Sequence, residues 1–472
     1  MSNDRKPNDR AHGGASADKP RAAKAPSAVY MLFAIVVLGS ALGNLSQTAV
    51  NAMMADIMVG FGAGVEVGQW LTTSYMLVLG VTVPASTYLQ RRFCVRVQVL
   101  LAFGLFIAGT ALSLVAQGFA MLLAGRILQA VAAGILLPVM QTVAMTGFGP
   151  GKQATAMGIA GVALGFAPNI GPTIGGAMSF AWGWRSFFAL MLALLAALAL
   201  WTLVAVRRQP SPDSSARLDA VSLTQSTLGF GGVLLGFSNA SSLGLASALV
   251  WGPMLLGVLF LVLFVRRQRR VADPLVSMGI FQCPQFTWGF IAQCLLTASF
   301  MGITLLVPLY VQNLCGGTAL DAGVVLLPGT VAALVLNPLA GVLTDRAGIR
   351  PVALAGGVLL SAGAVSMVFL SADTPLWLSM VLQGVRACGV STLIGPLTAW
   401  SLAKLPRPLV ADGSAFSIAA RQATASFGTS VMVLFVSAAA VAAIGAAAYA
   451  LAFGFSAVMA LALLVCIVAK VR

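Results

Sequence analysis

The segment at 184–206 reads WRSFFALMLALLAALALWTLVAV and holds one charged residue, Arg185, near its start. An apolar run of about twenty residues has the length of a helix that spans a bilayer. Similar runs recur along the 472 residues, of which 59% are hydrophobic and 8% charged. A soluble protein carries about 25% charged residues, and the strands of a membrane barrel alternate apolar and polar positions. The sequence therefore predicts an all-α polytopic membrane protein.

The distribution of basic residues indicates fourteen spans and an orientation. Lys and Arg gather in every second segment between the apolar runs, as in RRFCVR (91–96) and RRQRR (266–270), whereas the intervening segments hold only Arg185. Basic residues mark cytoplasmic segments, so we expect a multi-pass inner-membrane protein with both termini in the cytoplasm. The same pattern accounts for the net charge of +15 without nucleic acid as a partner. The expected spans lie near 29–51, 68–89, 97–117, 119–145, 153–178, 184–206, 222–240, 246–265, 286–310, 321–343, 350–371, 375–400, 410–436 and 443–468.

Two parts of the chain resemble each other. The first pair of similar segments is LQAVAAGILLPVMQT (128–142) and LQGVRACGVSTLIGP (382–396). A second pair, STYLQRRFCV (86–95) and GVLTDRAGIR (341–350), lies before the first pair at nearly the same distance in both parts of the chain. We therefore predict two six-helix halves, 28–206 and 285–472, with a substrate site between them at the middle of the membrane. A linker with two extra transmembrane helices, 207–284, separates the halves. Residues 1–27 are expected to form a disordered cytoplasmic tail.

Four segments carry a resemblance to a known family. They are the glycine–proline segment GVALGFAPNIGPTIGG (161–176), GRILQAVAAG (125–134), the loop segment GVLTDRAGIRP (341–351) and LSQTAVNAMMADI (45–57). Together they resemble motifs of the major facilitator superfamily, in its fourteen-helix drug:proton antiporter branch (the EmrB/QacA type). The resemblance implies a secondary active transporter that exports small hydrophobic or cationic compounds by proton antiport and alternating access. Its partners would be a small-molecule substrate, protons, the lipid bilayer and, in some arrangements, a periplasmic adaptor protein.

The sequence departs from this branch at positions that matter for coupling. Ser46 stands where the first-helix motif has an acidic residue, and Gln90 stands where the first copy of the loop motif has Asp. Proton coupling would then need another carboxylate. The candidates are Asp412, Asp56 and Glu66. Each lies at a predicted helix end or in a loop, where a solvated carboxylate without a role in coupling is the alternative.

Polar side chains within three spans are the candidates for substrate binding and translocation. Polar residues are costly against lipid, so they should face the interior of the bundle. The set comprises Asn44, Gln47 and Asn51 in the first span, Arg126 and Gln129 in the fourth, and Arg421 in the thirteenth. The alternatives are interhelical hydrogen bonds for the amides and snorkelling toward the headgroups for Arg126.

The fifth span and one loop are the candidates for gating. Pairs of glycines four residues apart permit close helix contact, and proline removes a backbone donor and bends a helix. The loop after the tenth span is expected to hold the two halves together by contacts with charges and helix dipoles, or else only to fix topology by its charge. The gating set is Gly161, Gly165, Pro168, Gly171, Pro172, Gly175, Gly176, Asp345, Arg346 and Arg350.

Enzymatic, cofactor and metal chemistry find no support. The only histidine, His12, lies in the polar tail, and the six cysteines are scattered without a CxxC pair. GFGPGKQ (147–153) lacks the glycine spacing and the Ser or Thr of a phosphate-binding loop. We expect no cofactor and no metal. Two other functions stay open: export of one specific endogenous metabolite, and a transport-incompetent relative that acts as a sensor or assembly partner.

Overall fold

The computed structural model describes residues 27–207, 218–244, 247–271, 273–441 and 445–471. The predicted tail therefore lies almost entirely outside the described residues. Within them the chain is helical and contains no strand. The elements are α1 (Ser27–Phe61), α2 (Val65–Gly68), α3 (Trp70–Arg92), α4 (Val95–Leu114), α5 (Phe119–Gly147), α6 (Gln153–Trp182), α7 (Arg185–Ala205), α8 (Ala220–Leu243), α9 (Ala248–Gln268), the 3₁₀-helix η1 (Met278–Gln282), α10 (Pro284–Phe300), α11 (Ile303–Leu309), the π-helical turn η2 (Tyr310–Leu314), α12 (Ala319–Ala347), α13 (Ile349–Met367), α14 (Leu376–Ala403), α15 (Arg407–Val441) and α16 (Gly445–Lys470).

Each of the fourteen predicted spans falls on a helix, with α10, α11 and η2 together forming one of them. Among the described residues, twelve helices are long and apolar enough to cross a membrane. The two spans that fall short of this apolarity are α3 and α15. They pack against each other, so their polar residues lie between helices rather than against lipid.

Local signals in the sequence set several helix ends. Asp219 caps α8 by accepting hydrogen bonds from the backbone N–H groups of Val221 and Ser222. Thr318 and Asp321 form a reciprocal capping box at the start of α12. Gly348 adopts a φ of +84° and separates α12 from α13, a conformation that glycine reaches without a steric cost.

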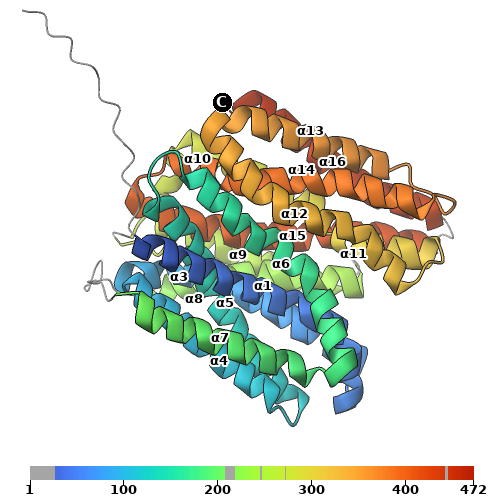
Figure 1. Cartoon of the computed structure of the whole chain (residues 1–472), viewed down its shortest axis with the longest axis horizontal. Coiled ribbons are helices and arrows are strands. Elements are labelled where there is room, and N and C mark those ends of the chain that lie inside the picture. The colour runs from blue at the N-terminus through green and yellow to red at the C-terminus, as the bar shows by residue number, and fades with distance from the viewer. Residues whose placement is uncertain (1–26, 208–217, 245–246, 272, 442–444, 472) are drawn as a thin grey trace, which may run out of the picture.

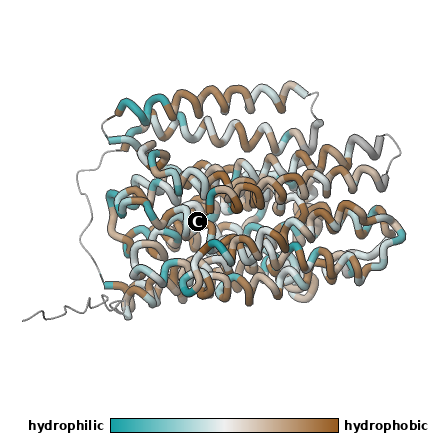
Figure 2. The backbone as a smooth tube through the Cα atoms, turned by 90° about the horizontal axis from the view of Figure 1, so that it is seen from above, coloured by the Kyte–Doolittle hydropathy of each residue, from teal (hydrophilic) through white to brown (hydrophobic). Residues whose placement is uncertain are grey.

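The helices form two bundles that lie side by side (Figure 1). The first contains α1 and α3–α7, and the second contains α10–α16. Between the bundles, α6 packs on α12 and α14, and α3 packs on α15. The pair α8 and α9 stands on one side as an outer layer (Figure 2), where α8 covers the line along which α3 meets α15. This is the predicted plan of two six-helix halves with an inserted helical pair.

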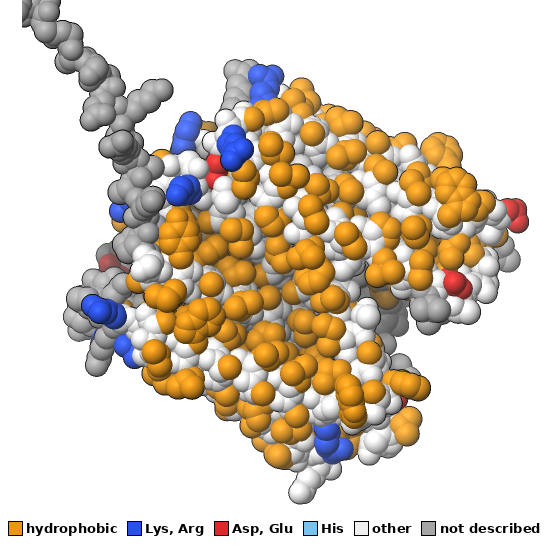
Figure 3. Space-filling model, in the orientation of Figure 1, with side chains coloured by type: hydrophobic (Ala, Val, Ile, Leu, Met, Phe, Trp, Pro, Cys, Tyr) orange, Lys and Arg blue, Asp and Glu red, His pale blue; other side chains and the backbone are white. Residues whose placement is uncertain are grey.

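The outer surface matches a membrane environment. Figure 3 shows hydrophobic side chains over most of the visible face, with most basic groups gathered at one end. Large apolar residues such as Phe180 are exposed, in this case to 94%. We call the end that carries the connections 93–94, 148–152, 348 and 404–406 the basic end. At the opposite end the outline in Figure 3 is indented between the two halves.

Candidate functional site between the two halves

A cavity lies where the two halves face each other. Its volume is about 70 Å³, which is small beside the roughly 300–1,000 Å³ of sites for drug-sized ligands. A substrate of that size would therefore require the halves to separate further. The lining residues are Asn44, Leu137 and Leu164 of the first half, and Gln293, Leu296, Thr297, Phe300, Met301, Ile394, Ile418, Arg421 and Gln422 of the second.

A buried amide holds the polar wall of this cavity in place. Gln293 of α10 donates from Nε2 to Ser401 Oγ (2.9 Å), and its Oε1 accepts from Thr398 Oγ1 (3.2 Å). Arg421 Nη1 lies 3.5 Å from the same Oε1, at the limit of a hydrogen bond. The two contacts within 3.2 Å fix the amide, and the guanidinium of Arg421 is left facing the cavity with a weak partner.

Asn44 contributes from the opposite wall. Its Nδ2 donates to the carbonyl oxygens of Ser40 and Ala163, both at 3.1 Å, which ties the side chain to α1 and α6. The structure thus brings together two residues from the predicted substrate set, Asn44 and Arg421, in one cavity. Gln47, which belongs to the same predicted stripe, is half-buried and is not part of the lining.

Arg126 forms a separate cluster inside the first half. Its side chain is fully buried, and Nη1 donates to Ser46 Oγ (2.9 Å) and Gln129 Oε1 (2.7 Å). The guanidinium also lies over the ring of Tyr75, 4.3 Å from its centroid, and Gln129 donates to Thr110 Oγ1. Nε and Nη2 of Arg126 have no hydrogen-bond partner. The cluster therefore holds a buried cation next to Ser46, the position at which the related first-helix motif has an acidic residue. None of the residues in this cluster lines the cavity.

Three further sequence candidates lie near the opposite end. Asn51 is exposed and accepts a hydrogen bond from Thr72 Oγ1 (2.5 Å). Asp56 accepts a hydrogen bond from Ser179 of α6 within the same half. The side chain of Glu66 lies outside the described residues. The structure places neither Asn51 nor Asp56 in the cavity wall.

Asp412 joins the two halves at the basic end. Its side chain is 0% exposed and forms an ion pair with Arg91 of α3 at 2.6 Å. The side chain of Arg91 is 34% exposed. Arg91 Nη1 also donates to the carbonyl of Pro274 (2.6 Å), and the N–H of Ser277 donates to Asp412 Oδ2 (3.0 Å). We call this set the α3–α15 junction. A solvated helix end, which the sequence also allowed, does not describe Asp412, because the neighbouring linker and α3 cover it.

A second contact between the halves, the α6–α12 junction, uses Asp345. Its carboxylate accepts from the backbone N–H groups of Ala154 (3.2 Å) and Thr155 (2.7 Å), in the first turn of α6. A carboxylate at this place satisfies free N–H groups and the positive end of the helix dipole. Arg346 and Arg350, predicted with Asp345, are exposed and form no ion pair among the residues described.

The glycines of α6 divide into two groups. Toward the basic end the helix meets the second half so closely that a Cβ on Gly158 would lie 2.5 Å from the carbonyl of Asn337, and Gly161 and Gly165 face the same asparagine. Farther along, Gly171 and Gly175 press against Thr48 and Ala49 of α1 in their own half, and Gly176 makes looser contact with α1. Pro168 and Pro172 lie inside α6, which continues to Trp182.

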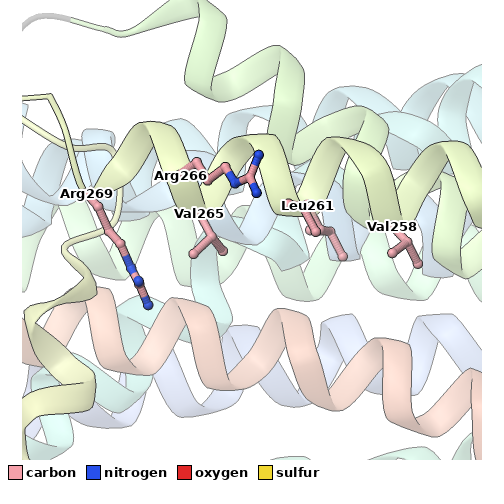
Figure 4. Close-up of a pocket in the computed structure, with 6 residues that line it drawn as sticks. Val258, Leu261, Val265, Arg266 and Arg269 are labelled. Carbon is pink, nitrogen blue, oxygen red and sulfur yellow. The ribbon is translucent and has the colours of Figure 1, made fainter.

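Another groove lies on the outer face of α9. Figure 4 shows Val258, Leu261 and Val265 along one side of the helix, with Arg269 at its basic end. The helix contacts α8 and is otherwise largely exposed. This groove therefore faces the surroundings of the protein and is remote from the cavity between the halves.

Sequence reasoning missed part of the site. Gln293, Thr297 and Gln422 line the cavity but were not selected. A single amide within the apolar ninth span, 286–310, was the available signal for Gln293. The junction partner of Asp412 had no such signal, because Arg91 is 321 positions away in the chain. The same applies to Ser414 of α15, which donates to Gln141 of α5 at 2.8 Å.

Comparison with known proteins is consistent with this architecture. The sequence profile of the Major Facilitator Superfamily matches residues 36–429. An uncharacterized MFS-type transporter of Bacillus subtilis, YcnB, is 34% identical over 409 residues, with 85% of both chains covered. The lincomycin resistance protein LmrB of Listeria monocytogenes is 33% identical, with 86% of both chains covered. The multidrug resistance protein B homolog of Mycobacterium tuberculosis is 27% identical over 84% of this chain and 74% of its own.

Solved structures show the same fold at low identity. The proton:xylose symporter XylE superposes with a TM-score of 0.66 at 12% identity, covering 94% of this chain and 96% of its own. The human organic anion transporter MFSD10 gives 0.65 at 14% identity, with 93% and 100% covered. With the profile match, the bacterial relatives and two helical halves around a central cavity, the chain belongs to the major facilitator superfamily.

Proposed function

We propose that the protein is a secondary active exporter of small hydrophobic compounds that works by alternating access, in the fourteen-helix drug:proton antiporter branch. The observation that carries this proposal is the central cavity together with two junctions that join the halves at the basic end. A cavity between two halves that are joined at one end fits one state of an alternating-access cycle. Relatives named as lincomycin and multidrug resistance proteins support export as the direction.

The orientation belongs to the same proposal. Basic residues favour the cytoplasmic side, so the basic end would lie in the cytoplasm with both termini, and the opposite end would face outward across the inner membrane. In this orientation the structure represents an outward-facing state. A compound in the cavity would leave through the indentation shown in Figure 3. A periplasmic adaptor protein would be an additional partner in this arrangement.

Proton antiport is the proposed driving force, with Asp412 as the carboxylate to test first. Among the described residues that line the cavity there is no Asp or Glu, and Ser46 leaves Arg126 without a carboxylate. Protonation of Asp412 would break its ion pair with Arg91 and favour opening of the basic end. This is the direction that an antiporter needs when a proton replaces the exported compound.

Uptake of an uncharged hydrophobic dye into inverted membrane vesicles tests the proposal. Accumulation that depends on this protein and collapses with a protonophore would support proton-driven export. Accumulation that is insensitive to the protonophore would contradict proton antiport but keep the exporter. No accumulation by inserted protein would favour the second candidate, an exporter of one specific metabolite, for which the missing first-helix acid at Ser46 is the supporting observation. A sensor or assembly partner would show neither dye nor metabolite transport.

A further inference from the structure

The central cavity carries an unbalanced positive charge. Arg421 is the one charged side chain among the described residues that line it. A guanidinium has five N–H donors, and the only hydrogen bond described for Arg421 is the 3.5 Å contact with Gln293 Oε1. That oxygen already accepts from Thr398 at 3.2 Å. Most of the donor capacity of Arg421 is therefore available to a molecule in the cavity.

Nearby carboxylates do not supply the missing counter-charge. In the part of the chain that the structure describes, every Asp lies near a helix end or in a connecting segment. Three of them are held there by other partners: Asp412 by Arg91, Asp345 by the start of α6, and Asp219 by Arg267. None is placed to neutralise Arg421.

The rest of the helical core has the same sign. Arg126 and Arg386 are 0% and 4% exposed, and both donate to uncharged side-chain oxygens, Arg126 to Gln129 and Ser46 and Arg386 to Gln383. Arg386 Nε donates to Gln383 Oε1 (2.9 Å), and its Nη1 has no hydrogen-bond partner. A buried cation is costly in a membrane unless it is paired or faces water. The interior therefore disfavours a cationic ligand and favours an anionic one.

We propose that the cavity recognises amphiphilic organic anions, with Arg421 binding a carboxylate or a similar oxyanion. This inference rests on the proposed export function and names its substrate class. Arg421 would donate to the anionic group from one wall, and an arginine fork suits two carboxylate oxygens. The apolar part of the ligand would lie against Leu137, Leu296 and Phe300. Lipophilic cations, which the family resemblance also implied, would meet Arg421 with no carboxylate beside it.

Binding of three matched probes tests this proposal. The probes are a dansyl-labelled fatty acid, its primary amide and the corresponding primary amine, each titrated against full-length protein in nanodiscs, with empty nanodiscs subtracted. The wild type should bind the acid at least about tenfold more tightly than the amide, because hydrogen bonds to charged groups are stronger than neutral ones. The amine should bind most weakly. Equal affinity for acid and amide, or preference for the amine, would overturn the proposal even without any variant.

Variants then assign the charge to one residue. Arg421→Met should weaken the acid by about tenfold to a hundredfold and leave the amide within about twofold, whereas Arg421→Lys should retain much of the preference. Arg269→Met, on the outer face of α9, serves as the matched control and should leave all three affinities unchanged. Equal weakening of acid and amide by Arg421→Met would show a merely structural role. Vesicle uptake of the amide by the wild type distinguishes the two proposals. If the amide is taken up but the acid does not bind more tightly than the amide, only the anion inference is refuted.

Discussion

Replacing Asp412 by Asn tests whether the α3–α15 junction holds the basic end closed. Asn has nearly the same shape and keeps an oxygen for the N–H of Ser277, which lies 3.0 Å from the carboxylate. It removes the charge that pairs with Arg91 at 2.6 Å. Hydrogen bonds to charged groups contribute about 1.5–3 kcal/mol, whereas exposed ion pairs contribute about 0–1 kcal/mol.

The geometry of this pair places the effect near the lower limit of the range for hydrogen bonds to charged groups. Asp412 is 0% exposed, but Arg91 is 34% exposed and keeps its hydrogen bond to the carbonyl of Pro274. We therefore expect a loss of about 1.5 kcal/mol from the closed state. Because about 1.4 kcal/mol corresponds to a tenfold change in an equilibrium constant, the ratio of open to closed basic ends should rise about tenfold.

Distances between spin labels report this equilibrium directly. Pro150 and Lys404 are exposed at the basic end in opposite halves, and cysteines placed there can carry labels once the six native cysteines are replaced. The variant should populate a longer distance than the parent protein. Arg91→Gln should act similarly, and the double variant should add little to either single change. An unchanged distance distribution in Asp412→Asn, or fully additive effects in the cycle, would refute the reasoning.

Three further outcomes follow from other contacts. Gly158→Val should prevent closure of the basic end and stop export without blocking membrane insertion, because its Cβ would lie 2.5 Å from a backbone oxygen; label distances and the amount of protein in the membrane check this. Ser46→Asp should raise the melting temperature by giving Arg126 Nη1, 2.9 Å from Ser46 Oγ, a charged partner; an unchanged or lower value in thermal unfolding would contradict this. Hydrogen bonding to Arg267 lowers the pKa of Asp219 from 3.8 to about 2, so this pair should stabilise the α8–α9 pair above about pH 4 and lose its effect toward pH 2. Hydrogen exchange in α8 measures that loss, and Asp219→Asn should show no such pH dependence.

Patterns that repeat along the chain were sufficient to predict the fold. Apolar runs and alternating basic segments located the helices, and the internal repeat indicated two halves. These signals are local or depend on average composition, so one residue more or less does not alter them. The lower apolarity of α3 and α15 has its cause in the tertiary structure, since these two helices pack against each other between the halves.

The site was predicted only in part because it depends on contacts between distant segments. Asn44 and Arg421 were recognised from their cost in lipid, a property of each residue alone, and both line the cavity. The same reasoning selected Arg126, which the structure places in a separate cluster with Tyr75 and Ser46. A polar residue inside a span must face away from lipid, but this requirement does not say whether it faces a cavity or a neighbouring helix.

The two junctions explain a departure that the sequence alone left without a reason. In the second half, the loop motif supplies its carboxylate, Asp345, to the first turn of α6. In the first half the corresponding motif has Gln90 in place of Asp, and Arg91 makes the charged contact. The carboxylate comes instead from Asp412, near the start of α15. Each junction thus joins the end of a helix in one half to the beginning of a helix in the other through a carboxylate. In the α6–α12 junction the carboxylate belongs to the helix end, and in the α3–α15 junction it belongs to the helix start. Loss of Asp from the first motif is therefore compatible with a closed basic end.

Proton binding would act on the two junctions differently. Asp345 accepts hydrogen bonds from uncharged donors, the backbone N–H groups of Ala154 and Thr155 and the Thr155 hydroxyl, whereas neutral Asp412 would leave Arg91 without its counter-ion.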